Sequence, residues 1–154
     1  MRIGSFAFAA ALVVSAVPAL AGWQNREGGS AADGGTFVVA ETRNNGESVV
    51  GVACQQGSLS VWIEPKGFAS MEQIFDFHYR FDGGKPVEAA WNVDYLTQLT
   101  MADSPGQKDG EARAFAEGLV RHSTLTLDIF AVDPISFSLK GSSGPIHKVL
   151  AACE

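Results

Sequence analysis

The feature that most constrains the fold is an alternation of aromatic residues near the middle of the chain. Rings recur at every second position from Phe75 to Phe81, with polar residues between them. In a β-strand this spacing places all the rings on one face, because successive side chains point to opposite sides. Residues 82–86 then supply turn chemistry, and apolar residues alternate again from Val87 to Val93. The stretch predicts a β-hairpin with one aromatic face that has to be buried.

The same pattern predicts the length of the hairpin loop. A three-residue loop over residues 83–85 pairs Phe77 with Trp91 and sets Arg80 opposite Glu88 on the outer face. A two-residue turn would place polar residues opposite apolar ones, because a shift of one residue exchanges the two faces. We therefore expect an odd-length loop, with Phe77 and Trp91 on the same face.

The N-terminus has the pattern of a secretory signal peptide. Arg2 precedes an apolar run over residues 6–20, and the small residues Ala19 and Ala21 fit a cleavage site. A membrane anchor is the competing interpretation, but a span needs about twenty apolar residues and usually a basic flank. We expect a signal peptide over residues 1–21, cleaved after Ala21.

The remaining residues, 22–154, have the length of one ordinary domain. Without Arg2 they hold ten Lys and Arg against seventeen Asp and Glu, a formal charge of −7. This balance argues against nucleic acid and against an anionic membrane surface as partners. We expect a periplasmic or secreted domain that keeps no integral membrane segment once the signal is removed.

Both cysteines, Cys54 and Cys153, fall in the exported part. An even count in an oxidising compartment predicts one disulfide between them, with two buried free thiols as the alternative. The C-x-x-C spacing of a metal knuckle or a thioredoxin-like site is absent from the sequence.

Short strand patterns and turn signals cover most of the remaining residues of the mature chain. Strand patterns cover residues 37–43, 48–54, 58–64, 95–101, 124–132 and 135–139. Helical spacing appears over residues 109–122, with Asp109 as the expected N-cap, and again from Gly144. Residues 23–35 are expected to be a loose lead-in whose Trp23 docks on the body. About eight strands and two helices predict a mainly β (α+β) fold. We expect an antiparallel β-sandwich or rolled sheet with one mid-chain helix and a short C-terminal helix.

The order of these elements resembles a known family. The residues that carry the likeness are Cys54, residues 79–84, Trp91, Phe115, Leu119, residues 137–141 and Cys153. With the exported start and the early tryptophan, the pattern resembles the VasI-like small exported accessory proteins of type VI secretion loci, over nearly the whole mature chain. The resemblance implies a periplasmic β-rich domain with no established enzymatic role, and it brings no catalytic residues.

Two places could carry function. Asp76, His78 and Arg80 share the polar side of the aromatic strand, a set able to do acid–base work, although alternation alone also predicts a polar outer face. Trp62 lies on the polar side of its own strand, where an exposed ring can anchor a partner. We take these four residues as the candidate binding surface.

Other chemistry has little support in the sequence. No serine or cysteine lies in a nucleophile elbow, so no catalytic residue is predicted. The three histidines are too scattered for a zinc site, and the acidic residues over 103–111 do not match a calcium loop. The glycine pairs at 28–29 and 34–35 lack the lysine and context of a phosphate cradle. We predict no metal and no cofactor.

We therefore expect a non-catalytic domain that binds another exported or periplasmic protein, with a secretion-system role implied by the resemblance alone. The alternatives are an inhibitor of an exported hydrolase and a small periplasmic hydrolase. A buried His–carboxylate pair in a cleft would favour the hydrolase. A flat sheet face with an exposed Trp62 would favour binding.

Overall fold

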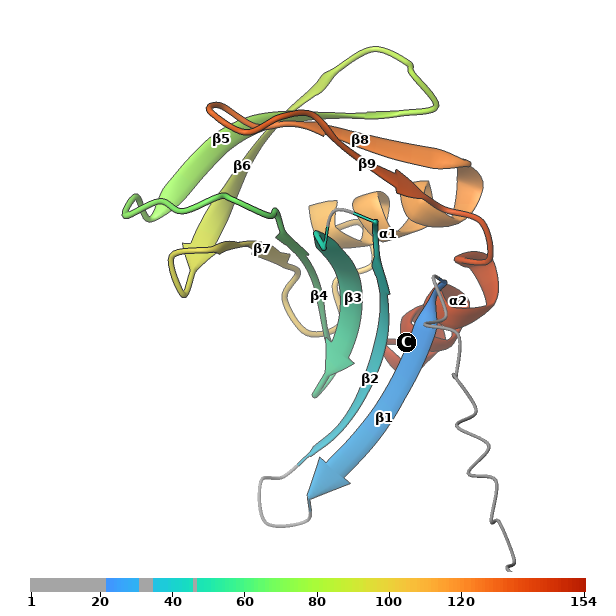
Figure 1. The fold of residues 1–154 in the computed structure, drawn as a ribbon. Coiled ribbons are helices and arrows are strands. Elements are labelled where there is room, and N and C mark those ends of the chain that lie inside the picture. The colour runs from blue at the N-terminus through green and yellow to red at the C-terminus, as the bar shows by residue number, and fades with distance from the viewer. Residues whose placement is uncertain (1–21, 31–34, 46) are drawn as a thin grey trace, which may run out of the picture.

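The computed structural model describes residues 22–30, 35–45 and 47–154, so the expected signal peptide lies outside the described residues. Within them, nine strands form one antiparallel sheet and two helices pack against it (Figure 1). The strands are β1 (Gln24–Ser30), β2 (Gly35–Arg43), β3 (Val49–Gln55), β4 (Ser58–Glu64), β5 (Ile74–Phe81), β6 (Val87–Asp94), β7 (Gln98–Ala102), β8 (Thr124–Asp128) and β9 (Ile135–Ser138). The helices are α1 (Glu111–Arg121) and α2 (Ser143–Ala152).

The sheet is one continuous layer that curls on itself. Its strand order is β1-β2-β3-β4-β7-β6-β5-β8-β9, and every neighbouring pair is antiparallel. Figure 1 shows α1 inside the curl and α2 beside β1 and β2. The mainly β, α+β class is confirmed. Of the two expected architectures the structure has the rolled sheet, because hydrogen-bonded strand pairs connect β1 to β9 without a break.

The aromatic face of β5 is buried against α1. The ring of Phe115, on α1, lies 5.1 Å from that of Tyr79 and 4.9 Å from that of Trp91, nearly perpendicular to both. Phe77 meets Trp91 edge to face at 5.3 Å. Edge-to-face pairs place the positive edge of one ring against the negative face of another, and each contributes about 0.5–1.5 kcal/mol beyond the area it buries. The mid-chain helix is therefore what covers the aromatic face.

The predicted register of the β5–β6 hairpin is wrong by two residues. Phe77 lies opposite Ala89 rather than Trp91. A shift of two residues leaves every side chain on its expected face, because side chains alternate with period two. Phe77 and Trp91 accordingly still share the buried side, as predicted.

The end of β5 extends past the part that pairs with β6, and its other edge pairs with β8. Arg80 pairs with Thr126 of β8 rather than with Glu88, which lies opposite His78. The loop between the paired parts of β5 and β6 covers residues 80–86, an odd number as expected but longer than three. The hairpin pattern alone contains no sign of β8 or of the longer loop.

The N-terminal segment that was expected to be loose is a strand. β1 pairs along its length with β2, beginning with Gln24 opposite Glu41. Trp23 packs half-buried against the core, as predicted for its side chain. The strand signal is hidden by glycine, which is required at Gly28 because a Cβ there would meet the Phe37 ring at 2.6 Å.

The predicted disulfide is confirmed. Cys54 at the end of β3 is bonded to Cys153 at the end of α2, with the two Cα atoms 5.6 Å apart and 99 residues apart in sequence. Both cysteines are buried. The bond fixes the C-terminal helix to the sheet, where α2 contacts β2 and β3.

Asp109 does not cap α1, contrary to prediction. The N-cap position is Gly110, which has no side chain to offer a hydrogen bond. The carboxylate of the buried Asp103 accepts hydrogen bonds from the backbone N–H groups of Ala112 at 3.0 Å and Arg113 at 2.9 Å. Gly110 leaves room for it, since a Cβ there would lie 2.0 Å from the Asp103 carboxyl carbon. An acceptor from outside the helix thus satisfies its first N–H groups.

Candidate functional site

The polar face of β5 lies where the sequence places it. Asp76 and His78 are exposed and Arg80 is half-buried, on the side opposite the rings. His78 Nε2 lies 3.6 Å from Glu88 Oε1, and Arg80 forms an ion pair with Asp128 of β8. Both basic side chains are thus held by carboxylates of neighbouring strands. Asp76 has no ion-pair partner among the described residues.

A hollow of about 330 Å³ lies on this face and is lined by Asp76, Phe77, His78, Glu88, Ala89 and Ala90. Two carboxylates and one imidazole border it, so it presents mainly negative charge. No serine, threonine or cysteine is among the residues that line it, so the hollow offers no hydroxyl or thiol nucleophile.

Trp62 does not join this surface as a projecting anchor. It lies opposite Gly51 of β3, and a Cβ on Gly51 would fall 2.2 Å from its ring. The ring therefore lies flat over the neighbouring strand and is half-buried. β7 and β6 separate its strand from β5. The structure brings Asp76, His78 and Arg80 together and leaves Trp62 apart from them.

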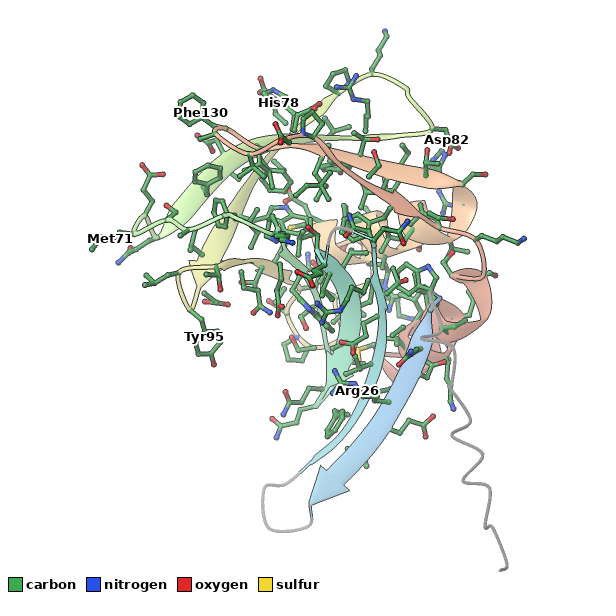
Figure 2. The ribbon with its side chains drawn as sticks, viewed as in Figure 1. Arg26, Met71, His78, Asp82, Tyr95 and Phe130 are labelled. Carbon is green, nitrogen blue, oxygen red and sulfur yellow. A yellow bond between two sulfur atoms is a disulfide. The ribbon has the colours of Figure 1, made fainter. Side chains whose placement is uncertain are left out.

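The most exposed apolar side chains gather at one end of the sheet. Met71, Tyr95 and Phe130 are 93%, 90% and 87% exposed, and Ile74 and Leu96 are each 57% exposed. They come from the loop before β5, from the start of β5, from the β6–β7 turn and from the β8–β9 turn. Figure 2 shows the labelled Met71, Tyr95 and Phe130 along the same end of the molecule. We call these five residues the apolar end.

Backbone hydrogen bonds connect the segments of the apolar end. The N–H of Ser70 donates to the carbonyl of Leu96 at 2.8 Å, and the N–H of Val93 donates to that of Gln73 at 2.9 Å. The loop before β5 is therefore fixed to the β6–β7 turn. β8 runs antiparallel to β5, so the turn that follows it, which carries Phe130, lies toward the first residues of β5.

The turns that present these side chains have an unfavourable backbone. Tyr95 and Leu96 have φ of 53° and 66°, and Ala131, which follows Phe130, has φ of 64°. The left-handed conformation costs an L-residue about 1–2 kcal/mol, so glycine and asparagine usually occupy it. Bulky residues with positive φ are outliers that cluster at functional sites. Folding alone would not favour Tyr and Leu at this turn.

Four carboxylates lie close in sequence to the members of the apolar end. Glu72, Asp76, Asp94 and Asp133 are exposed, each lies within three residues of one of its members, and we call them the acidic rim. None of them forms an ion pair with another described residue. The three segments that build this end contain no Lys and no Arg: residues 68–79, 87–102 and 126–134.

A histidine–carboxylate pair lies beyond the other end of β5. His122 Nδ1 is 2.9 Å from Asp82 Oδ2, and the His122 ring stacks on Phe81. Asp82 Oδ1 accepts hydrogen bonds from the N–H groups of Ser123 at 2.8 Å and Thr124 at 2.9 Å. The hydrogen bond from His122, followed by these two, lowers the pKa of Asp82.

A carboxylate that orients a histidine is also an arrangement used in base catalysis. Here the two side chains are 43% (Asp82) and 41% (His122) exposed, so the pair is not the buried one that would favour a hydrolase. Among the described residues, no serine, threonine or cysteine hydrogen-bonds to His122. The carboxylate instead fastens the end of β5 to the start of β8.

The other histidines engage separate partners. His78 contacts Glu88, and His147 contacts the hydroxyl of Ser143 at 3.2 Å. Over the described residues, no group of three or more His, Cys, Asp or Glu side chains is placed to hold a metal ion.

A groove of about 480 Å³ lies between the two helices. Its polar lining consists of Arg113, Glu117, Arg121, His147 and Glu154. Arg121 and Glu117 form an ion pair with each other. Charges of both signs line the groove, so its chemistry selects no single class of ligand.

Comparison with protein-family models, with curated proteins and with solved structures finds no match to this chain. No helix in the part of the chain that the structure describes has the length and apolar character needed to cross a membrane.

Sequence reasoning missed the apolar end because its members resemble core residues when the sequence is considered alone. Two signals could have found it. Tyr95 and Leu96 directly follow the end of the Val87–Val93 alternation, and Phe130 and Ala131 closely precede the turn signal Asp133-Pro134. The expected strands over residues 95–101 and 124–132 included these side chains, whereas β7 begins only at Gln98 and β8 ends at Asp128. Large apolar residues between two strands point to a turn that presents them to solvent.

Proposed function

We propose that the mature protein is a non-catalytic exported domain that binds another protein through the apolar end. The observation that carries the proposal is the near-complete exposure of Met71, Tyr95 and Phe130 on adjoining turns. Exposed apolar patches with a polar border mark protein-interaction sites, and aromatic residues and methionine are enriched in them. Tyrosine and other aromatic anchors supply much of the binding energy of an interface.

The left-handed turns support the same proposal. A chain selected for stability alone would place Asn or Gly at Tyr95 and Leu96. Retaining large side chains at a cost in stability is the usual trade-off at a functional surface. The contact we propose adjoins Asp76 and His78 but does not require Trp62.

The compartment is part of the proposal. Disulfides form and persist in oxidising compartments, and the Cys54–Cys153 bond is compatible with export. The signal-like residues 1–21 and the resemblance to VasI-like proteins suggest the periplasm. A role in a secretion system is the narrower form of the proposal, and inhibition of an exported hydrolase is another.

The test begins with a photo-crosslinking residue introduced at position 130 in the native host. A protein captured there is identified, purified and titrated against the parent and two variants by calorimetry. We expect Phe130→Ser to weaken binding at least tenfold, because anchor residues contribute about 2 kcal/mol or more. The matched control is Val87→Ser, which removes an exposed apolar side chain outside the apolar end. Equal affinities for the parent and Phe130→Ser would overturn the proposal.

The hydrolase alternative has its own test. His122 is the histidine placed beside a carboxylate, so a turnover measured in the purified parent and lost in a folded His122→Ala protein would make the protein an enzyme.

A further inference from the structure

We infer that the surface recognised by the apolar end is cationic: a protein whose apolar pockets are bordered by Lys and Arg. The inference rests on the proposed function and names the chemistry of its partner. Its basis is the sign of the charges near the apolar end that have no ion-pair partner among the described residues, which is negative.

The charge asymmetry is local and not merely an effect of the net charge. The three segments to which the members of the apolar end belong, residues 68–79, 87–102 and 126–134, contain six Asp and Glu and no Lys or Arg. Two of the six are already paired with a basic side chain, Glu88 with His78 and Asp128 with Arg80, and Asp94 accepts a hydrogen bond from the Thr100 hydroxyl at 2.7 Å. The four that remain are the acidic rim.

A partner that covers the apolar end has to cover part of this rim as well. Withdrawing a carboxylate from water costs free energy unless an opposite charge or a hydrogen-bond donor replaces the water. Like charges brought together across an interface cost several kcal/mol, whereas complementary charges speed association and fix orientation. A basic border on the partner meets both requirements.

The same argument disfavours two other binding partners of the apolar end, a second copy of the chain and an anionic membrane. In a two-fold dimer the same patch of each copy meets its own equivalent, so the rim of one copy would face the rim of the other. An anionic membrane surface attracts basic segments, and the three segments offer no Lys or Arg. A basic protein surface is the occupant that the charges favour.

The probe for the test is a random peptide library displayed on phage and selected on the exported, purified protein. We expect the enriched peptides to place Lys or Arg on both sides of an aromatic or aliphatic residue. Their affinity should fall steeply with salt, because screening weakens exposed charge pairs. Peptides enriched without basic residues would overturn the inference.

The decisive variant neutralises the rim and leaves the apolar side chains in place: Glu72→Gln, Asp76→Asn, Asp94→Asn and Asp133→Asn together. Exposed ion pairs contribute modestly one by one, so we expect about a tenfold loss of affinity over four of them and a flatter salt dependence. The matched control neutralises four exposed carboxylates away from this end: Glu27→Gln, Asp109→Asn, Glu111→Gln and Glu154→Gln. An unchanged affinity of the rim variant would contradict the inference.

The outcomes separate the inference from the proposed function. If peptides lose binding to Phe130→Ser but not to the rim variant, the apolar end binds and the cationic partner is wrong. If no selected peptide depends on Phe130, both fail. Dimerisation at high concentration that Phe130→Ser abolishes, or sedimentation with phosphatidylglycerol vesicles, would replace the cationic protein with a second copy or a membrane.

Discussion

At the scale of single residues, two carboxylates hold elements together through backbone N–H groups. Asp103 caps α1 from outside the helix, and Asp82 joins the end of β5 to β8. Neither role could be predicted from the sequence. Asp103 lies in a loop eight residues before the helix begins, and Asp82 belongs to a run of turn-forming residues. Their partners become neighbours only after the sheet has curled.

Replacing Asp103 should destabilise the fold. Its buried carboxylate accepts two backbone hydrogen bonds, and bonds to a charged acceptor contribute about 1.5–3 kcal/mol. We expect Asp103→Ala to lower the free energy of unfolding by about 2–3 kcal/mol in urea titrations. Asp109→Ala is the matched control, since Asp109 is exposed and does not cap the helix. A larger effect for Asp109 would contradict the assignment of the cap.

Asp82 should make stability depend on pH in the acid range. Its pKa is lowered in the folded state, first by His122 and then by the N–H groups of Ser123 and Thr124. A lowered folded pKa means that the contribution is present above the unfolded pKa and is lost as the pH falls through the folded one. In Asp82→Asn the unfolding free energy should therefore change less between about pH 6 and pH 2.5 than in the parent. Parallel profiles for the two proteins would count against this role, and Asp76→Asn is the control.

At the scale of elements, the buried and outer faces of the strands could be predicted from the sequence, but the strands they pair with could not. Alternation correctly placed Phe77 and Trp91 on the buried side and Asp76 and His78 on the outer side. The predicted pairing of β5 with β6 was wrong by two residues, and the pairing of the other edge of β5 with β8, more than forty residues later, has no sign in the hairpin pattern. Likewise β1 has no apolar side chain that could show an alternating strand pattern, and its pairing depends on β2.

Gly118 illustrates how tertiary packing overrides helix propensity. An alanine inside a helix is normally about 1 kcal/mol more stable than a glycine. Here a Cβ would lie 2.5 Å from the ring of Phe81, which is itself packed between Phe115 and His122. Overpacking costs about 1–3 kcal/mol, so Gly118→Ala should lower the melting temperature.

The control for this substitution lies on α2. A Cβ on Gly144 would meet no atom within 4 Å, so Gly144→Ala should be neutral or stabilising. Thermal unfolding followed by circular dichroism checks both variants. Stabilisation by Gly118→Ala would refute the close approach of α1 and β5.

At the scale of the whole molecule, the curled sheet, the helix inside it and the disulfide act as one unit. The class, the two helices and the Cys54–Cys153 bond were predictable from periodicity, spacing and cysteine count. The apolar end was not, because it is assembled from three connections and the start of β5, which meet only in the folded chain. The rigid body behind these turns is what allows them to keep an unfavourable backbone conformation.

The disulfide should contribute substantially to stability. It closes a span of 99 residues, and removing such a bond from a small exported domain typically costs about 2–5 kcal/mol. We expect the double variant Cys54→Ser/Cys153→Ser to lose about this much in urea titrations, while the parent shows no free thiol without reductant. Equal stability of the two proteins, or two free thiols in the parent, would contradict the bond's role.

The central claim is that Tyr95 and Leu96 are kept for binding at the expense of folding. The double variant Tyr95→Asn/Leu96→Gly gives the turn its preferred residues, so it should raise the free energy of unfolding by about 1 kcal/mol. The most direct measurement combines that stability with the affinity for the protein captured through position 130. We predict a variant that is more stable than the parent and binds at least tenfold more weakly. A variant that binds as tightly as the parent would contradict the account, whatever its stability.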